Sequence, residues 1–191
     1  MAALAQTAVH IFGASGSGTS TLGAAVASAI DGVHLDTDAY YWQPTDPPFV
    51  RAHPPLKRLQ AIARDTAAQP RWVLSGSLCG WGDRLIQNFT LAVFVTLDRD
   101  IRMARLKARE SQRYGARIEP GGDMHATHLA FMRWAASYDT ASAPTRSLAL
   151  HRAWLAQLTC PVLHLDAAQP VERLTAAVVE AIGQQHQSPA R

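Results

Sequence analysis

The sequence predicts an α/β fold, in which helices cover both faces of a parallel β-sheet. Three observations predict it. Short apolar runs end at glycine, serine or aspartate, apolar stripes at helical spacing separate them, and a glycine-rich segment joins the first run to the first stripe. Strands that alternate with helices form parallel sheets. The chain of 191 residues can bury a sizeable core, and we expect a single domain over residues 1–191.

Five apolar runs are the predicted strands. Residues 7–12 form the first, which stops at a glycine, and residues 33–35 form the second, which stops at an aspartate. Residues 72–74 form the third and stop at a Ser-Gly pair. Residues 91–97 are almost entirely apolar, as expected for a central strand of a parallel sheet, and residues 161–166 form the last strand.

The segments between these runs carry apolar residues at helical spacing. One helix follows the glycines, and Pro54-Pro55 opens another, since proline suits the first turn of a helix. Residues 99–113 are predicted to be helical and are rich in arginine. Asp123 is a suitable N-cap for a further helix, residues 146–158 form another, and a last apolar stripe begins at Val171.

The glycine-rich segment is the strongest functional feature of the sequence. In such a loop, backbone N–H groups converge on phosphate oxygens, and the helix that follows adds the positive end of its dipole. Gly13 and Gly18 have the spacing of the pattern G-x-x-x-x-G-K-[ST], and Ser20 stands where a Mg²⁺-binding hydroxyl belongs, but Thr19 replaces the lysine. We expect the loop to bind nucleotide phosphates through Gly13, Ala14, Ser15, Gly16, Ser17, Gly18, Thr19, Ser20 and Thr21.

A dinucleotide-binding protein, such as an NAD(P)-dependent reductase, is a less favoured interpretation of the same segment. Asp36 ends the second strand, where a ribose-binding acid sits in such proteins. However, the glycines are spaced G-x-x-G-x-G rather than G-x-G-x-x-G. Neither Lys57 nor Lys107 follows a tyrosine by four residues, as the lysine of the short-chain reductases does.

Composition narrows the possible partners and the compartment. The net charge is only +3, which does not favour a nucleic-acid partner. Cys79 and Cys160 are too few and too far apart for a disulfide framework or a cysteine-based zinc site. The N-terminus lacks the cationic start of a secretory signal, and no apolar run approaches the ~20 residues that span a bilayer. We therefore expect a cytoplasmic protein that does not contact membranes.

Three features together resemble the nucleoside-monophosphate and shikimate kinase group. They are the loop at residues 13–20, the sequence Asp36-Thr37-Asp38 at the end of the second strand, and the arginine helix after the fourth strand. The chain looks most like uncharacterised bacterial members described as adenylate-kinase-like or AAA-family ATPases, in which the loop lacks its lysine. The resemblance implies a three-layer P-loop fold with a five-stranded parallel sheet in the order 2-3-1-4-5. It also implies a substrate-binding insertion at about residues 38–70 and a lid at about residues 111–123.

The function that the resemblance implies is phosphoryl transfer from ATP, with Mg²⁺, to an unidentified small-molecule or nucleotide acceptor. Asp38 is expected to orient an acceptor hydroxyl and take its proton, with Asp36 in support. Arg51, Gly76 and Asp83 are further candidates for substrate binding, and Ser20 for metal binding. A non-catalytic nucleotide-binding or sensory protein is the alternative, because Thr19 replaces the lysine.

Arginines supply the remaining catalytic candidates. Arg102, Arg105, Arg109 and Arg113 are spaced three, four and four residues apart, so they lie along one helical face. The positive charges of such a stripe repel one another unless a bound anion or nearby carboxylates balance them. The resemblance implies that arginines near the lid clamp the transferred phosphoryl group, which favours Arg105, Arg109 and Arg113 as catalytic residues. A solvated charged face is the alternative explanation.

Overall fold

A five-stranded parallel sheet forms the frame of the protein. The computed structural model describes residues 6–187, and its strands are ordered β2-β3-β1-β4-β5. Their bounds are Thr7–Gly13 for β1, Val33–Asp36 for β2, Arg71–Ser75 for β3, Leu91–Thr96 for β4 and Val162–Asp166 for β5. The central strands β3, β1 and β4 are almost completely buried, because helices cover both faces of the sheet.

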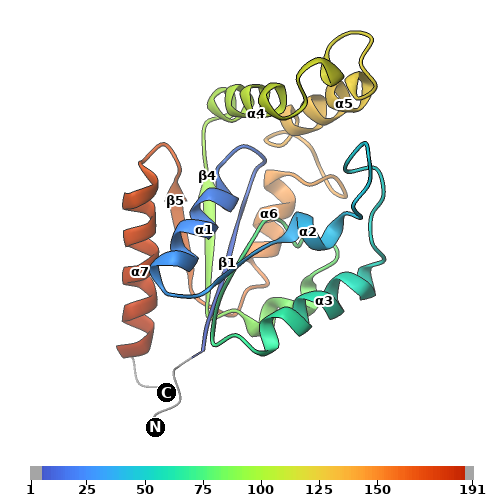
Figure 1. Cartoon of the computed structure of the whole chain (residues 1–191). Coiled ribbons are helices and arrows are strands. Elements are labelled where there is room, and N and C mark those ends of the chain that lie inside the picture. Colours follow the sequence, from blue (N-terminus) through green and yellow to red (C-terminus); the bar gives the residue numbers. More distant parts are fainter. Residues whose placement is uncertain (1–5, 188–191) are drawn as a thin grey trace.

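The helices form two layers against the sheet and a third group beyond its carboxyl edge (Figure 1). On one face lie α1 (Thr19–Ala29) and α7 (Val171–Gln187). On the other lie α3 (Pro55–Ala67), α6 (Leu148–Leu155) and the 3₁₀ turn η1 (Asp83–Asn88). The short α2 (Thr37–Tyr41) follows β2. Beyond the strand ends lie α4 (Arg99–Tyr114), η2 (Gly115–Ile118) and α5 (His125–Ala136).

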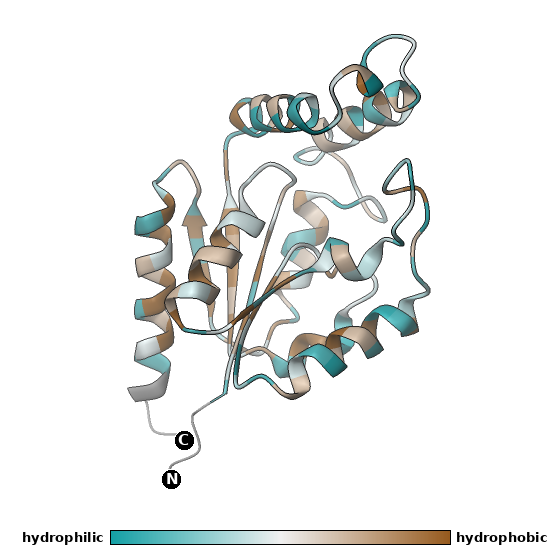
Figure 2. Cartoon of the chain, viewed as in Figure 1, coloured by the Kyte–Doolittle hydropathy of each residue, from teal (hydrophilic) through white to brown (hydrophobic). Residues whose placement is uncertain are grey.

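Alternation along β1 divides the interior into two apolar cores. Val9 and Ile11 pack into the core under α1 and α7, whereas Ala8 and Phe12 pack into the core under α3 and α6. Successive strand side chains point to opposite faces, so one buried strand serves both layers. Figure 2 shows the apolar colouring concentrated on the strands and the inward surfaces of the helices. Among residues 6–187, none of the helices has the length and apolarity needed to cross a bilayer.

The strand order confirms the predicted fold class and excludes the dinucleotide-binding alternative. β3 lies between β2 and β1, whereas dinucleotide-binding sheets place β2 directly beside β1. All five predicted strands are present, with bounds that differ by one or two residues.

Two local predictions were wrong. Asp123 does not cap α5, because its carboxylate accepts two hydrogen bonds from Arg117, at 3.0 and 2.6 Å, and Met124 precedes the helix instead. The helix predicted over residues 146–158 begins only at Leu148, where the Ser147 hydroxyl accepts a bond from the Leu150 amide at 3.2 Å. Arg146 therefore lies in the segment before the helix and not on the helix itself.

Candidate functional site

A cavity of about 660 Å³ opens at the carboxyl ends of the strands. Ligands of open α/β sheets bind at this edge, because the loops that follow the strands converge there. Its walls come from the glycine loop, the ends of β2 and β3, one face of α4, and the loop that follows β5. Most of the predicted site residues line it: the whole loop from Gly13 to Thr21, together with Asp36, Asp38, Gly76, Arg105, Arg109 and Arg113.

The glycine loop is a tight turn that leads into α1. The Ser17 amide and hydroxyl both donate to the Ala14 carbonyl, at 3.1 and 2.7 Å, which closes the turn on itself. Gly18 caps α1 with φ of 90°, a left-handed conformation that favours glycine. It offers no side chain to the first amides of the helix, so these stay available to a ligand. A loop of this form, at the positive end of a helix, suits an anion such as phosphate.

Ser20 and Asp36 form a pair beside this loop. The Ser20 hydroxyl donates to Asp36 Oδ2 at 2.6 Å, and Asp36 Oδ1 accepts from the Asp38 amide at 3.0 Å. Asp36 therefore caps α2 and fixes the hydroxyl of α1 at the same time. The Ser20 hydroxyl oxygen and the Asp36 carboxylate oxygen are hard ligands, which Mg²⁺ binds together with phosphates and waters. Within residues 6–187 there is no cluster of three or more His, Cys, Asp or Glu side chains that could hold a metal ion.

Asp38 faces the cavity two residues further on. Its pKa is raised above the ordinary value by partial desolvation and then by the negative charge of Asp36. The positive charges of Arg146, Arg109 and Arg113 oppose this rise. A carboxylate with a raised pKa at the wall of a cavity is suited to taking a proton from a bound hydroxyl.

The arginines of α4 divide into two groups. Arg105, Arg109 and Arg113 line the cavity, and Arg109 also donates to Glu110 at 2.9 Å. A guanidinium nitrogen of Arg105 lies 3.9 Å from the position that a Cβ at Gly18 would occupy, so this arginine lies beside the glycine loop. Three cations thus face the carboxyl edge of the sheet, as an anionic ligand requires.

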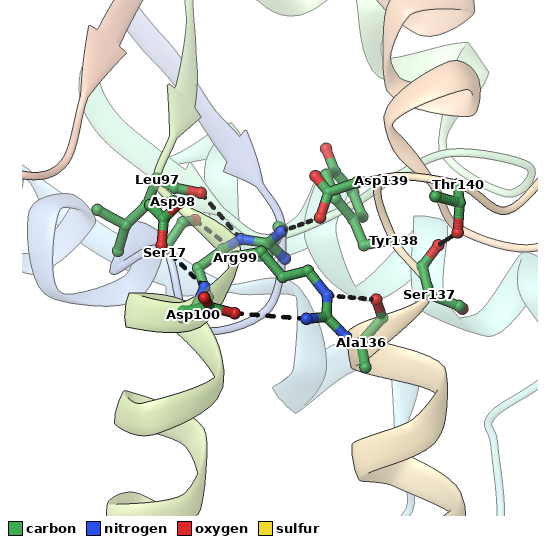
Figure 3. A network of polar contacts seen from close by, with 12 residues as sticks. Ser17, Leu97, Asp98, Arg99, Asp100, Ala136, Ser137, Tyr138, Asp139 and Thr140 are labelled. Carbon is green, nitrogen blue, oxygen red and sulfur yellow. Dashed lines mark hydrogen bonds and ion pairs between the residues drawn. The ribbon is translucent and has the colours of Figure 1, made fainter.

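Arg102 does not share this role, which corrects the interpretation of the four arginines as one stripe. Its side chain is 2% exposed, donates to the Leu97 carbonyl at 3.0 Å, and forms an ion pair with Asp139. Figure 3 shows Leu97 at the end of β4 and Asp139 in the segment that follows α5, within the same network. In that network Arg99 also donates to the Ala136 carbonyl at 3.1 Å. Arg102 therefore joins the base of α4 to the end of α5.

Comparison with known proteins places the chain in a family. It is 44% identical over 158 residues to "Uncharacterized protein YqaC" of Bacillus subtilis (strain 168), which covers 83% of this chain and 87% of that protein. The chain belongs to the YqaC family. No family sequence profile matches it.

The solved structures similar to this YqaC-family chain include two shikimate kinases and a sugar kinase. The shikimate kinase of Bacteroides thetaiotaomicron has a TM-score of 0.54 at 14% identity, covering 93% of this chain and 98% of its own. The Acinetobacter baumannii shikimate kinase, solved in complex with shikimate, has a TM-score of 0.53 at 12% identity and 96% of both chains. A sugar kinase from Janibacter sp. HTCC2649 has a TM-score of 0.50 at 16% identity, over 92% and 93%. Identities this low establish the fold alone: a P-loop kinase-type sheet.

Arg146 is a cavity residue that sequence reasoning missed. It donates a hydrogen bond to the Ser15 hydroxyl in the glycine loop, across 131 residues of sequence. Its guanidinium carbon lies 4.4 Å from the centre of the Trp134 ring. Burial lowers its pKa, and the negative charge of Asp38 opposes this effect. Nothing in the local sequence distinguishes it from other arginines, because its contacts all depend on the tertiary fold.

A buried hydrogen-bonded chain supports the part of the cavity wall at Ser77. Ser77, which lines the cavity, lies 3.1 Å from His151 Nε2, and the Tyr138 hydroxyl lies 2.7 Å from His151 Nδ1. Burial lowers the pKa of His151 to about 3, so the imidazole is neutral at ordinary pH. Burial also raises the pKa of Cys79 to about 11, so its thiol is protonated and a weak nucleophile at ordinary pH.

Two predicted substrate residues are not brought to the cavity. Arg51 is exposed in the loop before α3, where its carbonyl accepts a hydrogen bond from the Gln43 amide at 2.8 Å. Asp83 is exposed at the start of η1. Neither residue lines the cavity. Their assignment as substrate ligands is not supported by this geometry.

Proposed function

We propose that this protein is an ATP- and Mg²⁺-dependent kinase that acts on a small-molecule or nucleotide acceptor. The observation that carries the proposal is the shared cavity, in which the phosphate-type loop, the Ser20–Asp36 pair and the Asp38 carboxylate face one another. The similarity in fold to shikimate and sugar kinases supports it. We further propose that the enzyme is cytoplasmic and that, with a net charge of only +3, it takes neither a nucleic-acid polymer nor a membrane as partner.

Each group of cavity residues has a role in the proposed reaction. Loop residues 13–21 would hold the nucleotide phosphates, and Ser20 with Asp36 would hold Mg²⁺ through the hydroxyl and carboxylate oxygens. The bound ion would neutralise phosphate charge during transfer. Asp38 orients the acceptor hydroxyl and takes its proton, while a new P–O bond forms to that oxygen. The P–O bond to the leaving ADP breaks in the same step.

Three arginines of α4 and two further segments of the chain would complete the site. Arg105, Arg109 and Arg113 act on the charge of the transferring group, where fixed cations are most effective. Residues 38–70 form the acceptor-binding insertion, and residues 111–123 form the lid. An ion pair between Arg117 and Asp46, at 2.7 Å, already joins these two segments.

Acceptor-dependent formation of ADP tests the proposal. The protein is incubated with ATP, Mg²⁺ and a panel of nucleosides, nucleoside monophosphates, sugars and other small hydroxyl compounds, and ADP is measured. An active acceptor supports the proposal. Asp38→Asn should then lower turnover by about 10²- to 10⁴-fold, because a general base contributes that much. Asp100→Asn, an exposed carboxylate on α4 outside the cavity, is the matched control and should keep full activity.

A nucleotide-binding protein without phosphoryl transfer is the second candidate. Thr19 favours it, because the lysine that normally reaches the β- and γ-phosphates is absent from the loop. Tight binding of ATP with no ADP formed for any acceptor would support this second function over the first. Absence of ATP binding would contradict both.

A further inference from the structure

The cavity has cationic groups but no lysine. Lys57 lies on α3 and Lys107 on the exposed side of α4, and neither lines the cavity. Every basic side chain that lines the cavity is therefore an arginine: Arg105, Arg109, Arg113 and Arg146. A phosphate loop without its lysine needs another positive charge for the terminal phosphates, and these four are the available groups.

Arg146 differs from the other three in its direct bond to the loop. Its Nη2 donates to the Ser15 hydroxyl, while its guanidinium lies over the ring of Trp134. Arg105 and Arg113 are exposed side chains of α4, and Arg109 is already engaged by Glu110. Packing and hydrogen bonding restrict Arg146 to one position, and little entropy is lost when a fixed side chain binds a ligand.

The bonding capacity of Arg146 is largely unused. A guanidinium has five N–H donors, yet its Nε is buried and has no hydrogen-bond partner in the part of the chain that the structure describes. No carboxylate within residues 6–187 forms an ion pair with it. A partly buried charge with spare donors is unfavourable unless an anion binds to it. Arg146 thus presents a cation with an unpartnered donor beside the glycine loop.

The location of Arg146 indicates which phosphate it would meet. It bonds to the loop at Ser15, and the charge of Asp38 acts on it from the acceptor side of the cavity. In the proposed reaction it would therefore lie between the nucleotide and the acceptor. We propose that Arg146 binds the terminal phosphate of ATP and supplies the contact that the loop makes through a lysine in other proteins. This inference rests on the proposed nucleotide-binding function.

The planar guanidinium fits this task. It can offer two parallel N–H groups to two oxygens of one phosphate, as an ammonium group cannot. Trp134, which does not line the cavity, acts as a positioning residue because it fixes the plane of the fork, and the Ser15 hydroxyl of the loop holds Nη2. Arg146 should then discriminate between ATP and ADP, since only ATP carries the phosphate that it binds.

Calorimetric titration of the intact protein tests the inference, with Mg²⁺ and either ADP or the non-hydrolysable β,γ-imido analogue of ATP. Arg146→Ala should weaken binding of the analogue by about 10- to 100-fold, as expected for loss of a charge-assisted hydrogen bond, and should change ADP binding less than about threefold. Arg146→Lys should retain part of the preference. Arg152→Ala removes an exposed arginine of α6 and should change neither affinity.

The outcomes separate this inference from the proposed function. If the unaltered protein binds neither nucleotide, both are overturned. If it binds both nucleotides and Arg146→Ala weakens them equally, or weakens neither, the inference alone is wrong. Thermal unfolding shows whether Arg146→Ala folds. If it does not, Ser15→Ala takes its place, and an unchanged preference for the analogue over ADP in Ser15→Ala and Arg146→Lys overturns the inference.

Discussion

Replacing Arg102 with alanine should destabilise the protein by about 3 kcal/mol, although the same change elsewhere on α4 should have little effect. Its guanidinium is 2% exposed and is held by the Leu97 carbonyl and the Asp139 carboxylate. Breaking a buried ion pair by removing one partner costs about 3–5 kcal/mol. We expect the lower end, because Asp139 is 38% exposed and water can reach it once Arg102 is gone.

Urea unfolding followed by circular dichroism measures this difference directly. A loss of about 3 kcal/mol should lower the melting temperature by about 6–12 °C in a domain of this size. Lys107→Ala is the matched control, because Lys107 is an exposed cation on the same helix, and its effect should stay within about 0.5 kcal/mol. A cost of less than about 1 kcal/mol for Arg102→Ala would show that the Arg102–Asp139 pair does not hold α4 to the end of α5.

Two further predictions concern pH and a glycine. Burial lowers the pKa of His10 to about 4 and that of His151 to about 3, so below pH 6.5 the unfolded chain binds protons that the folded protein excludes. Stability should therefore fall with falling pH, by about 2 kcal/mol per histidine at pH 5, and His10→Phe should roughly halve the loss seen in urea titrations. Gly76→Ala should destabilise the protein by about 3 kcal/mol, because its φ is +105° and the new Cβ would lie 1.9 Å from Thr37 Oγ1. Gly80→Ala has a similar φ of +79° with nothing within 4 Å, so thermal melting should show a smaller effect, and equal effects would mean that the contact with Thr37 is unimportant.

The sequence was sufficient to predict the sheet, because its signals are local. Buried parallel strands are apolar on both faces, so residues 7–12 and 91–97 stand out as short apolar runs that end abruptly. The phosphate loop is likewise a contiguous pattern, and its position between strand and helix was predictable. The strand order was implied by resemblance to a kinase group, and the structure confirms it.

The division of roles among the arginines could not be predicted in the same way. Helical spacing correctly placed Arg102 and Arg105 on the same helix, but spacing does not show where α5 ends. The carboxylate of Asp139 arrives at the base of α4 from 37 residues away and makes Arg102 a buried structural residue. The charge pattern of one helix is therefore not enough to predict the role of each arginine, because the role also depends on partners from other segments.

Thr19 illustrates the same limit at the centre of the site. As a motif, the loop lacks its cation, which favours a protein that binds nucleotide without transferring phosphate. In three dimensions the required charge need not come from the loop, since phosphate oxygens attract any cation placed beside them. Ser147 caps α6, which begins at Leu148, so Arg146 lies in the segment before the helix. From this segment its side chain contacts Ser15. A helix that began at residue 146, as its sequence pattern predicted, would have tied this side chain to the helix surface. The late start of α6 is thus the local feature on which the contact between Arg146 and the glycine loop depends.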